Sequence, residues 1–174
     1  MRWFTDKAYA ADDADWDEML AAYSTHVARL VERLPPDLAT LATDPELNMH
    51  DASVHTMRVD LDEGTLDMVV FLYNGKALTF QFGGVGFRGA DGSEDDLHSI
   101  ACAIGATYVT DHWGTTRTTI HAQEVDLAED GRYLLRLRLR PFYEFEIAFR
   151  QISMAIEPAP PGLGPAGQLV LAGE

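Results

Sequence analysis

The chain has 174 residues, of which 47% are hydrophobic and 24% charged, a composition typical of one soluble globular domain. Its 28 acidic and 13 basic residues give a formal net charge of −15, which disfavours binding to nucleic acid or anionic membranes. The single cysteine, Cys102, excludes an intrachain disulfide and a cysteine-based zinc site. No apolar run has the length of a signal peptide or a membrane span, so we expect a cytoplasmic protein. We expect it to be a monomer or a homodimer.

The N-terminal part of the chain is predicted to be helical. Over residues 13–34, from Trp16 to Leu34, apolar side chains recur at i, i+3, i+4 and i+7, which predicts an amphipathic helix. Asp13 is suited to cap its start, and the Pro35-Pro36 pair ends it. A shorter helix is expected from Pro36 through about Ala42.

From residue 53 the apolar period changes from 3.6 to 2, which predicts strands. The expected strands cover residues 54–61, 66–73, 78–82, 107–113, 118–127, 133–140 and 144–156. Glycines 83, 84 and 86 break a strand, and we interpret them as a bulge or chain crossing rather than a phosphate loop. A short helix is expected from Ser93 to about Ala103.

Matching apolar residues across each turn predicts the pairing register. At the Asn74-Gly75 turn we favour a three-residue loop with a glycine bulge over a two-residue turn, because it keeps one apolar face continuous. The expected pairs are Val59 with Met68, Val70 with Phe80, Val125 with Leu137, and Leu137 with Ile147.

Residues 132–140 form the most distinctive stretch, because arginine and leucine alternate along a predicted strand. In isolation the arginine row resembles a track for phosphates. The expected registers, however, place acidic residues on both neighbouring strands beside it, which predicts an exposed ladder of opposite charges. The predicted pairs are Arg136 with Asp126, Arg138 with Glu124 and Glu146, and Arg140 with Glu144.

These elements predict an α+β fold in which the N-terminal amphipathic helix packs on a largely antiparallel meander sheet of six or seven strands. Four residues of the helix are expected to be buried against the apolar sheet face that carries Leu135 and Leu137, namely Trp16, Tyr23, Val27 and Leu30. Residues 1–156 form the expected domain, and residues 157–174 a tail rich in proline and glycine.

Few residues suggest chemistry. The sequence has no phosphate loop, nucleophile elbow or recognised zinc spacing, and Cys102 lies in an apolar setting typical of a buried thiol. The strongest candidates are His50 and Asp51 with Asp111 and His112, since both pairs fall near predicted strand ends. Capping of turns by these side chains is the competing interpretation, and we assign no catalytic residue, cofactor or metal.

Several short motifs resemble an uncharacterised family of small bacterial proteins. They are Arg2-Trp3-Phe4, Leu34-Pro35, His50-Asp51-Ala52, Asp111-His112-Trp113, Gly131-Arg132-Tyr133 and Pro141-x-x-Glu144. The resemblance covers most of residues 2–156 and implies a shared fold unit but no activity.

Two classes of function follow. The missing catalytic motifs and the negative charge favour a non-catalytic binding protein with an acidic surface, for example an immunity-type protein that neutralises a basic partner. The alternative is a small-molecule or metal-dependent enzyme that uses the His50, Asp51, Asp111 and His112 cluster. Convergence of these four side chains on one cleft would favour the enzyme.

Overall fold

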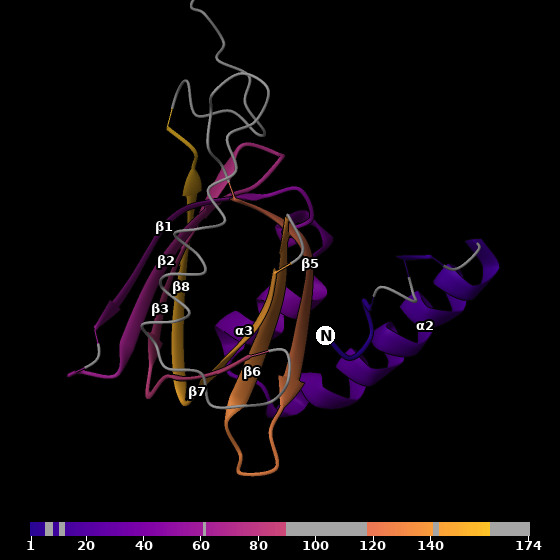
Figure 1. Ribbon diagram of the computed structural model, residues 1–174, viewed down its shortest axis with the longest axis horizontal. Helices are drawn as coiled ribbons and strands as arrows, with labels where there is room; N and C mark the ends of the chain where they lie inside the picture. The colour runs from indigo at the N-terminus through magenta and orange to yellow at the C-terminus, as the bar shows by residue number, and fades with distance from the viewer. Residues whose placement is uncertain (6–8, 11–12, 61, 90–117, 141–142, 161–174) are drawn as a thin grey trace, which may run out of the picture.

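The computed structural model describes residues 1–5, 9–10, 13–60, 62–89, 118–140 and 143–160 (Figure 1). Within these ranges the chain has the predicted α+β fold, a long N-terminal helix together with an antiparallel sheet. The strand expected at 107–113 and the helix expected from Ser93 lie outside the described residues. No helix in the described ranges is both long and apolar enough to cross a membrane.

The helices form where the sequence predicts them. Helix α2 spans Asp13–Leu30 and passes into a 3-10 turn, η1, at Val31–Arg33, shortly before the two prolines. Helix α3 spans Pro36–Thr43, with proline in its first turn, where the missing N–H costs no hydrogen bond. A second 3-10 turn, η2, covers Pro45–Leu47, and the Asp44 side chain caps it by accepting the Glu46 N–H at 2.9 Å.

All strand pairs in the sheet are antiparallel, and the order is β4-β7-β6-β5-β1-β2-β3-β8. Seven strands have seven residues or more, and β4 adds a short edge of four. The strands are β1 Ser53–Asp60, β2 Thr65–Phe71, β3 Lys76–Gly83, β4 Gly86–Gly89, β5 Thr118–Leu127, β6 Tyr133–Arg140, β7 Tyr143–Phe149 and β8 Gln151–Pro158.

The sheet is strongly curled, because two of its strand pairs are halves of one bent ladder. Strand β3 pairs with β8, and its continuation β4 pairs with β7, the strand that runs directly into β8. The bend falls at Gly84, whose φ of +63° favours glycine, and a Cβ there would lie 3.2 Å from the Cβ of Arg150. The predicted break in the strand at these glycines is therefore confirmed as a bend that curls the sheet (Figure 1).

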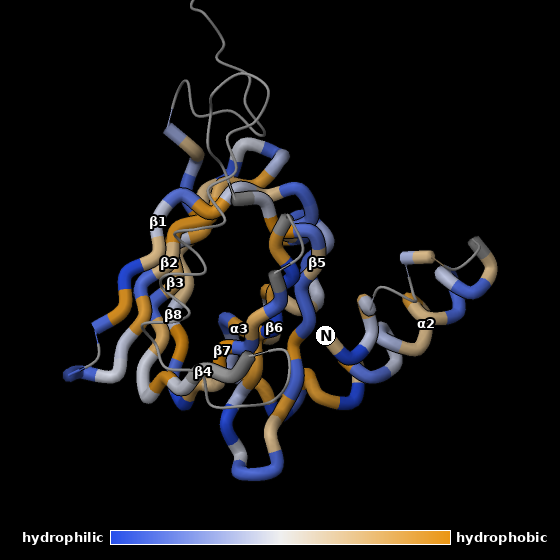
Figure 2. The backbone as a smooth tube through the Cα atoms, in the orientation of Figure 1, coloured by the Kyte–Doolittle hydropathy of each residue, from blue (hydrophilic) through white to orange (hydrophobic). Residues whose placement is uncertain are grey.

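The core fills the concave side of the sheet and includes α3. Leu38 and Leu41 of α3 are almost fully buried, as are Phe80 and Phe82 of β3 and Phe145 of β7. Hydrophobic and hydrophilic residues alternate along the strands in Figure 2, as expected for strands with one face toward a core. The short α3 thus covers the core face, and the long α2 contributes to the core, among its described residues, only through Leu30 at its end.

Each predicted register is wrong by two residues. Val59 lies opposite Leu66, Phe80 opposite Met68, Leu135 opposite Val125, and Leu137 opposite Phe145. A shift of two keeps every side chain on its predicted face, since the pleat repeats every two residues. The observed opposite-charge partners are Glu124 with Arg136, Arg136 with Glu146, and Arg138 with Glu144.

The predicted packing of α2 is confirmed at its C-terminal end, where Val27 and Leu30 are buried, and is wrong for Trp16. Leu135 and Leu137 face the core, whereas α2 lies outside β5 and extends away from the sheet (Figure 1). The side chain of Tyr23 reaches β5 by accepting the Val125 N–H at 2.8 Å, but Trp16 is only half-buried. The reason is that α2 faces the charged side of the sheet, and the chain's first residues are inserted between them.

Candidate functional site

The charge ladder is a buried network, which corrects the prediction that it would be exposed. Glu124 is fully buried, Arg138 is 3% exposed and Asp126 is 6% exposed. Arg136 is its centre, with Nη1 2.9 Å from Asp126 Oδ2 and 3.7 Å from Glu124 Oε2, and Nε 2.7 Å from Glu146 Oε2. The side chain of Arg140, predicted to belong to the ladder, lies outside what the structure describes.

The N-terminal arm, residues 1–5, covers this network. The carboxylate of Glu124 accepts the backbone N–H groups of Arg2, Trp3 and Phe4, at 2.6–3.1 Å. Arg138 Nη1 donates to the Phe4 carbonyl at 3.2 Å, which ties the same arm to β6. Because several hydrogen bonds to buried charged groups hold the arm, its position is fixed rather than adventitious.

Asp126 connects the ladder to α2. Burial raises the pKa of the Asp126 carboxyl, but hydrogen bonds from Arg136 and from the Leu127 N–H outweigh it and hold that pKa below its usual value. His26 of α2 lies 3.0 Å from the same carboxylate. The charged groups on the outer face of β5 and β6 therefore hold both the arm and the helix.

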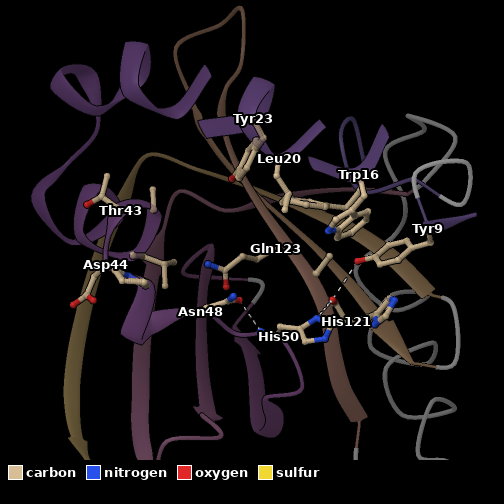
Figure 3. A pocket seen from close by; sticks show the side chains of 15 residues that line it. Tyr9, Trp16, Leu20, Tyr23, Thr43, Asp44, Asn48, His50, His121 and Gln123 are labelled. Carbon is tan, nitrogen blue, oxygen red and sulfur yellow. Dashed lines mark hydrogen bonds between the residues drawn. The ribbon is translucent and has the colours of Figure 1, made fainter. Parts of the chain in front are cut away.

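The arm and α2 together form one wall of a cleft. This α2–α3 cleft has a volume of about 420 Å³ and lies between α2, the end of α3 and β5 (Figure 3). Its described lining consists of Phe4, Tyr9, Trp16, Leu20, Tyr23, Leu41, Ala42, Thr43, Asp44, Pro45, Asn48, His50, His121, Ala122 and Gln123. In Figure 3, Tyr23, Leu20 and Trp16 project from α2 toward Gln123, Asn48 and His50 on the opposite side.

The aromatic side chains of the cleft contact one another. The Trp16 ring centroid lies 5.1 Å from that of Tyr9 and 6.0 Å from that of Phe4, and Phe4 meets Tyr23 edge-on at 5.2 Å. Tyr9 also stacks on His121, with 4.3 Å between ring centroids. Such tilted and stacked pairs stabilise the aromatic wall beyond the area they bury.

The polar side chains opposite the aromatic wall are engaged in hydrogen bonds to the backbone. His50 Nδ1 donates to the His121 carbonyl at 2.6 Å. Gln123 Oε1 accepts the Met49 N–H at 2.9 Å, and Asn48 Oδ1 accepts the His50 N–H at 2.9 Å. These contacts hold the residues between η2 and β1 against β5, and they preform the polar side of the cleft.

Of the four predicted site residues, the structure describes two. His50 lines the cleft, and its Nε2 lies 3.6 Å from Asp51 Oδ2. Asp51 has a φ of +61°, unusual for a residue other than glycine. Asp111 and His112 lie outside the described residues, so the predicted convergence of all four stays a prediction. Among the described residues, no group of three histidine, cysteine or acidic side chains is arranged to hold a metal ion.

Sequence reasoning missed the residues that build the cleft. The apolar period predicts that Trp16 lies in the core, and no sequence pattern points to Tyr9 or His121. The arm carried a visible signal, since Trp3 and Phe4 are two aromatic residues that precede the helix without belonging to its apolar stripe.

A comparison with protein-family models, a search of curated proteins and a search of solved structures each found no match.

The hydroxyl of Tyr23 predicts how stability responds to alkaline pH. Burial raises the pKa of Tyr23 to about 12, outweighing the Val125 N–H that lowers it. An unfolded tyrosine has a pKa of about 10, so between pH ~10 and ~12 the unfolded state loses its phenol proton while the folded state keeps it. The free energy of unfolding is therefore highest below pH ~10 and falls as the pH rises toward ~12. The expected decrease in the free energy of unfolding is about 2–3 kcal/mol. Denaturant melts across this range should show it, and Tyr23→Phe should remove it whereas Tyr73→Phe, at an exposed position, should not.

Proposed function

We propose that the protein is a non-catalytic binding protein that recognises a basic polypeptide, and that the α2–α3 cleft is its recognition site. The observation that carries the proposal is a preformed cleft walled by Phe4, Tyr9, Trp16 and Tyr23. Aromatic side chains in a preorganised recess are the usual anchor points of binding surfaces, because they bury much area at a small cost in conformational entropy.

The exterior of the protein supports a basic partner. Twelve acidic residues are exposed among the described side chains, against five basic ones. The acidic residues are Asp15, Asp17, Glu18, Glu32, Glu46, Asp60, Asp62, Glu63, Asp67, Glu129, Asp130 and Glu157, and the basic ones are Arg2, Arg29, Arg33, Arg58 and Arg150. The described surface is therefore predominantly acidic, which favours a partner of opposite charge.

The engaged polar side chains favour binding over catalysis. His50, Asn48 and Gln123 each hold a backbone group in place, so their hydrogen bonds maintain the shape of the cleft. This preference rests on Asn48 and Gln123, whose amide groups cannot act as general bases. His50 is compatible with either function, because Nδ1 donation to a carbonyl leaves Nε2 as the basic nitrogen.

An NMR titration of the ¹⁵N-labelled full chain with an octapeptide of alternating arginine and lysine tests the proposal. We expect the largest shift changes at the Trp16 indole N–H and at the amides of Ala42 and Gln123. Trp16→Leu should weaken binding by about tenfold, as expected for an aromatic anchor, whereas Tyr73→Ala should leave it unchanged. Shifts confined to the exposed Asp62-Glu63 turn, or equal binding by the Trp16 variant, would contradict the proposal.

A second candidate function is acid–base chemistry at the edge of the cleft. It is favoured by the 3.6 Å contact between His50 Nε2 and Asp51 Oδ2 together with the positive φ of Asp51, because strained backbone is common at functional sites. Under this alternative, His50→Gln would abolish turnover of a substrate while leaving its binding intact. Under the proposed function, the same variant changes only the affinity for the basic peptide.

A further inference from the structure

We propose that the α2–α3 cleft receives the guanidinium group of an arginine side chain, stacked on the indole of Trp16. This inference rests on the proposed function and specifies which group of the basic partner enters the cleft. A volume of about 420 Å³ is at the lower end of the range of about 300–1,000 Å³ for ligand pockets, which suits one side chain rather than a large ligand.

The same aromatic cluster already binds guanidinium groups of its own chain. Arg138 Cζ lies 4.9 Å from the centroid of the Tyr9 ring, and Arg2 Cζ lies 5.4 Å from the centroid of Trp3. Tyr9 and Trp3 belong to the aromatic layer that also contains Trp16 and Phe4. Trp16 is half-buried and projects into the cleft (Figure 3), and tryptophan binds cations more strongly than tyrosine or phenylalanine does.

The charge of the lining suits a cation. Among the described residues that line the cleft, none is lysine or arginine, and the one carboxylate belongs to Asp44. Helix α2 adds exposed acidic residues close to Trp16 in sequence, at Asp15, Asp17 and Glu18. A partner's cation therefore meets no described basic group in the cleft and enters a region of negative potential.

The polar side of the cleft favours guanidinium over ammonium. Gln123 Oε1 and Asn48 Oδ1 each accept one backbone N–H, and a carbonyl oxygen has a second lone pair for another donor. A guanidinium group offers five N–H donors in one plane, is weakly hydrated and stacks flat on an aromatic ring. An ammonium group is compact and strongly hydrated, so it gains less between an indole and two amides.

Three capped tripeptides test the inference on the full chain: Gly-Arg-Gly, Gly-Lys-Gly and Gly-citrulline-Gly. Citrulline keeps the shape of arginine but has no charge. From the usual strength of a cation–π contact, we expect the citrulline peptide to bind about five- to thirtyfold more weakly than the arginine peptide, and the lysine peptide to fall between them. The shift of the Trp16 indole N–H provides the readout.

Two variants locate the binding to the cleft. Trp16→Leu should remove the preference for arginine over citrulline while keeping an apolar side chain on α2. Asp44→Asn should weaken binding of the arginine peptide about two- to fivefold, because asparagine can still cap η2 but has no charge. Tyr73→Ala, at an exposed position, is the control and should change neither the preference for arginine over citrulline nor the affinity for the arginine peptide. Thermal melts of each variant would verify that it folds.

The outcomes separate this inference from the proposed function. Equal binding of the arginine and citrulline peptides, or of the arginine and lysine peptides, overturns the guanidinium site even if the basic octapeptide still shifts the cleft resonances. Failure of the octapeptide to shift those resonances overturns the proposed function and this inference together. A preference for arginine that survives Trp16→Leu would place the cation elsewhere and also overturn the inference.

Discussion

Replacing Arg136 with methionine is expected to lower the free energy of unfolding by about 3–5 kcal/mol, the cost of leaving buried carboxylates without their partner. The reason is its position between three carboxylates, of which Asp126 and Glu124 are buried. Its Nη1 lies 2.9 Å from Asp126 and 3.7 Å from Glu124, and its Nε lies 2.7 Å from Glu146. Methionine fills much of the same space, so the loss reports mainly charge and hydrogen bonding rather than a cavity.

Urea melts of the wild type and the variant measure this effect. Arg150→Met provides the control, because Arg150 is exposed, and its change should stay within about 0.5 kcal/mol. The penalty at Arg136 should shrink in strongly acidic solution, where Asp126, whose pKa is held below its usual value, takes up a proton and no longer needs a cation. A loss below 1 kcal/mol at neutral pH would show that the ladder contributes little.

Replacing Glu124 with alanine is expected to detach the N-terminal arm and to cost about 2–4 kcal/mol, because the charge-assisted hydrogen bonds from Arg2, Trp3 and Phe4 are lost together. The amides of Trp3 and Phe4 should then exchange with solvent much faster. Since Phe4 lines the cleft, the variant should also bind the basic octapeptide more weakly.

Two comparisons isolate the role of the Glu124 carboxylate. Glu124→Gln keeps the shape and one acceptor oxygen, so its cost should be smaller than that of Glu124→Ala. Exposed Glu129→Ala, at the end of the same hairpin, should have little effect on stability or exchange. Unchanged exchange of the arm amides in Glu124→Ala would mean that packing of Trp3 and Phe4, and not the carboxylate, holds the arm.

The fold could be predicted from the sequence as far as periodicity determines it. Alternation assigned Leu135 and Leu137 to the core face and Arg136 to the opposite face, and the structure confirms both. Periodicity cannot distinguish registers that differ by two residues, because both keep the same faces buried. The hairpin loops decide between them, because each observed hairpin is centred one residue earlier than the apolar pairing suggested. At the Asn74-Gly75 turn, for example, the Leu72 N–H donates to the Lys76 carbonyl at 2.8 Å, which centres the loop on Asn74.

The cleft was beyond sequence reasoning for a different reason. It forms where the arm, α2, α3 and β5 meet, and no local pattern predicts that four separate segments converge. The apolar stripe of α2 predicts a core contact, since a helix with one apolar face usually packs on a sheet. Here the arm occupies part of that position, so Trp16 contacts Phe4 and Tyr9 and remains partly open to a partner.

The most direct test of the account is an NMR measurement of intermolecular NOEs between the arginine tripeptide and the full chain. We expect contacts from the arginine side-chain protons to the Trp16 indole and to the side-chain amide of Gln123, which lie on opposite sides of the cleft (Figure 3). Contacts confined to exposed acidic residues such as Asp62 and Glu63, with none to Trp16, would contradict it.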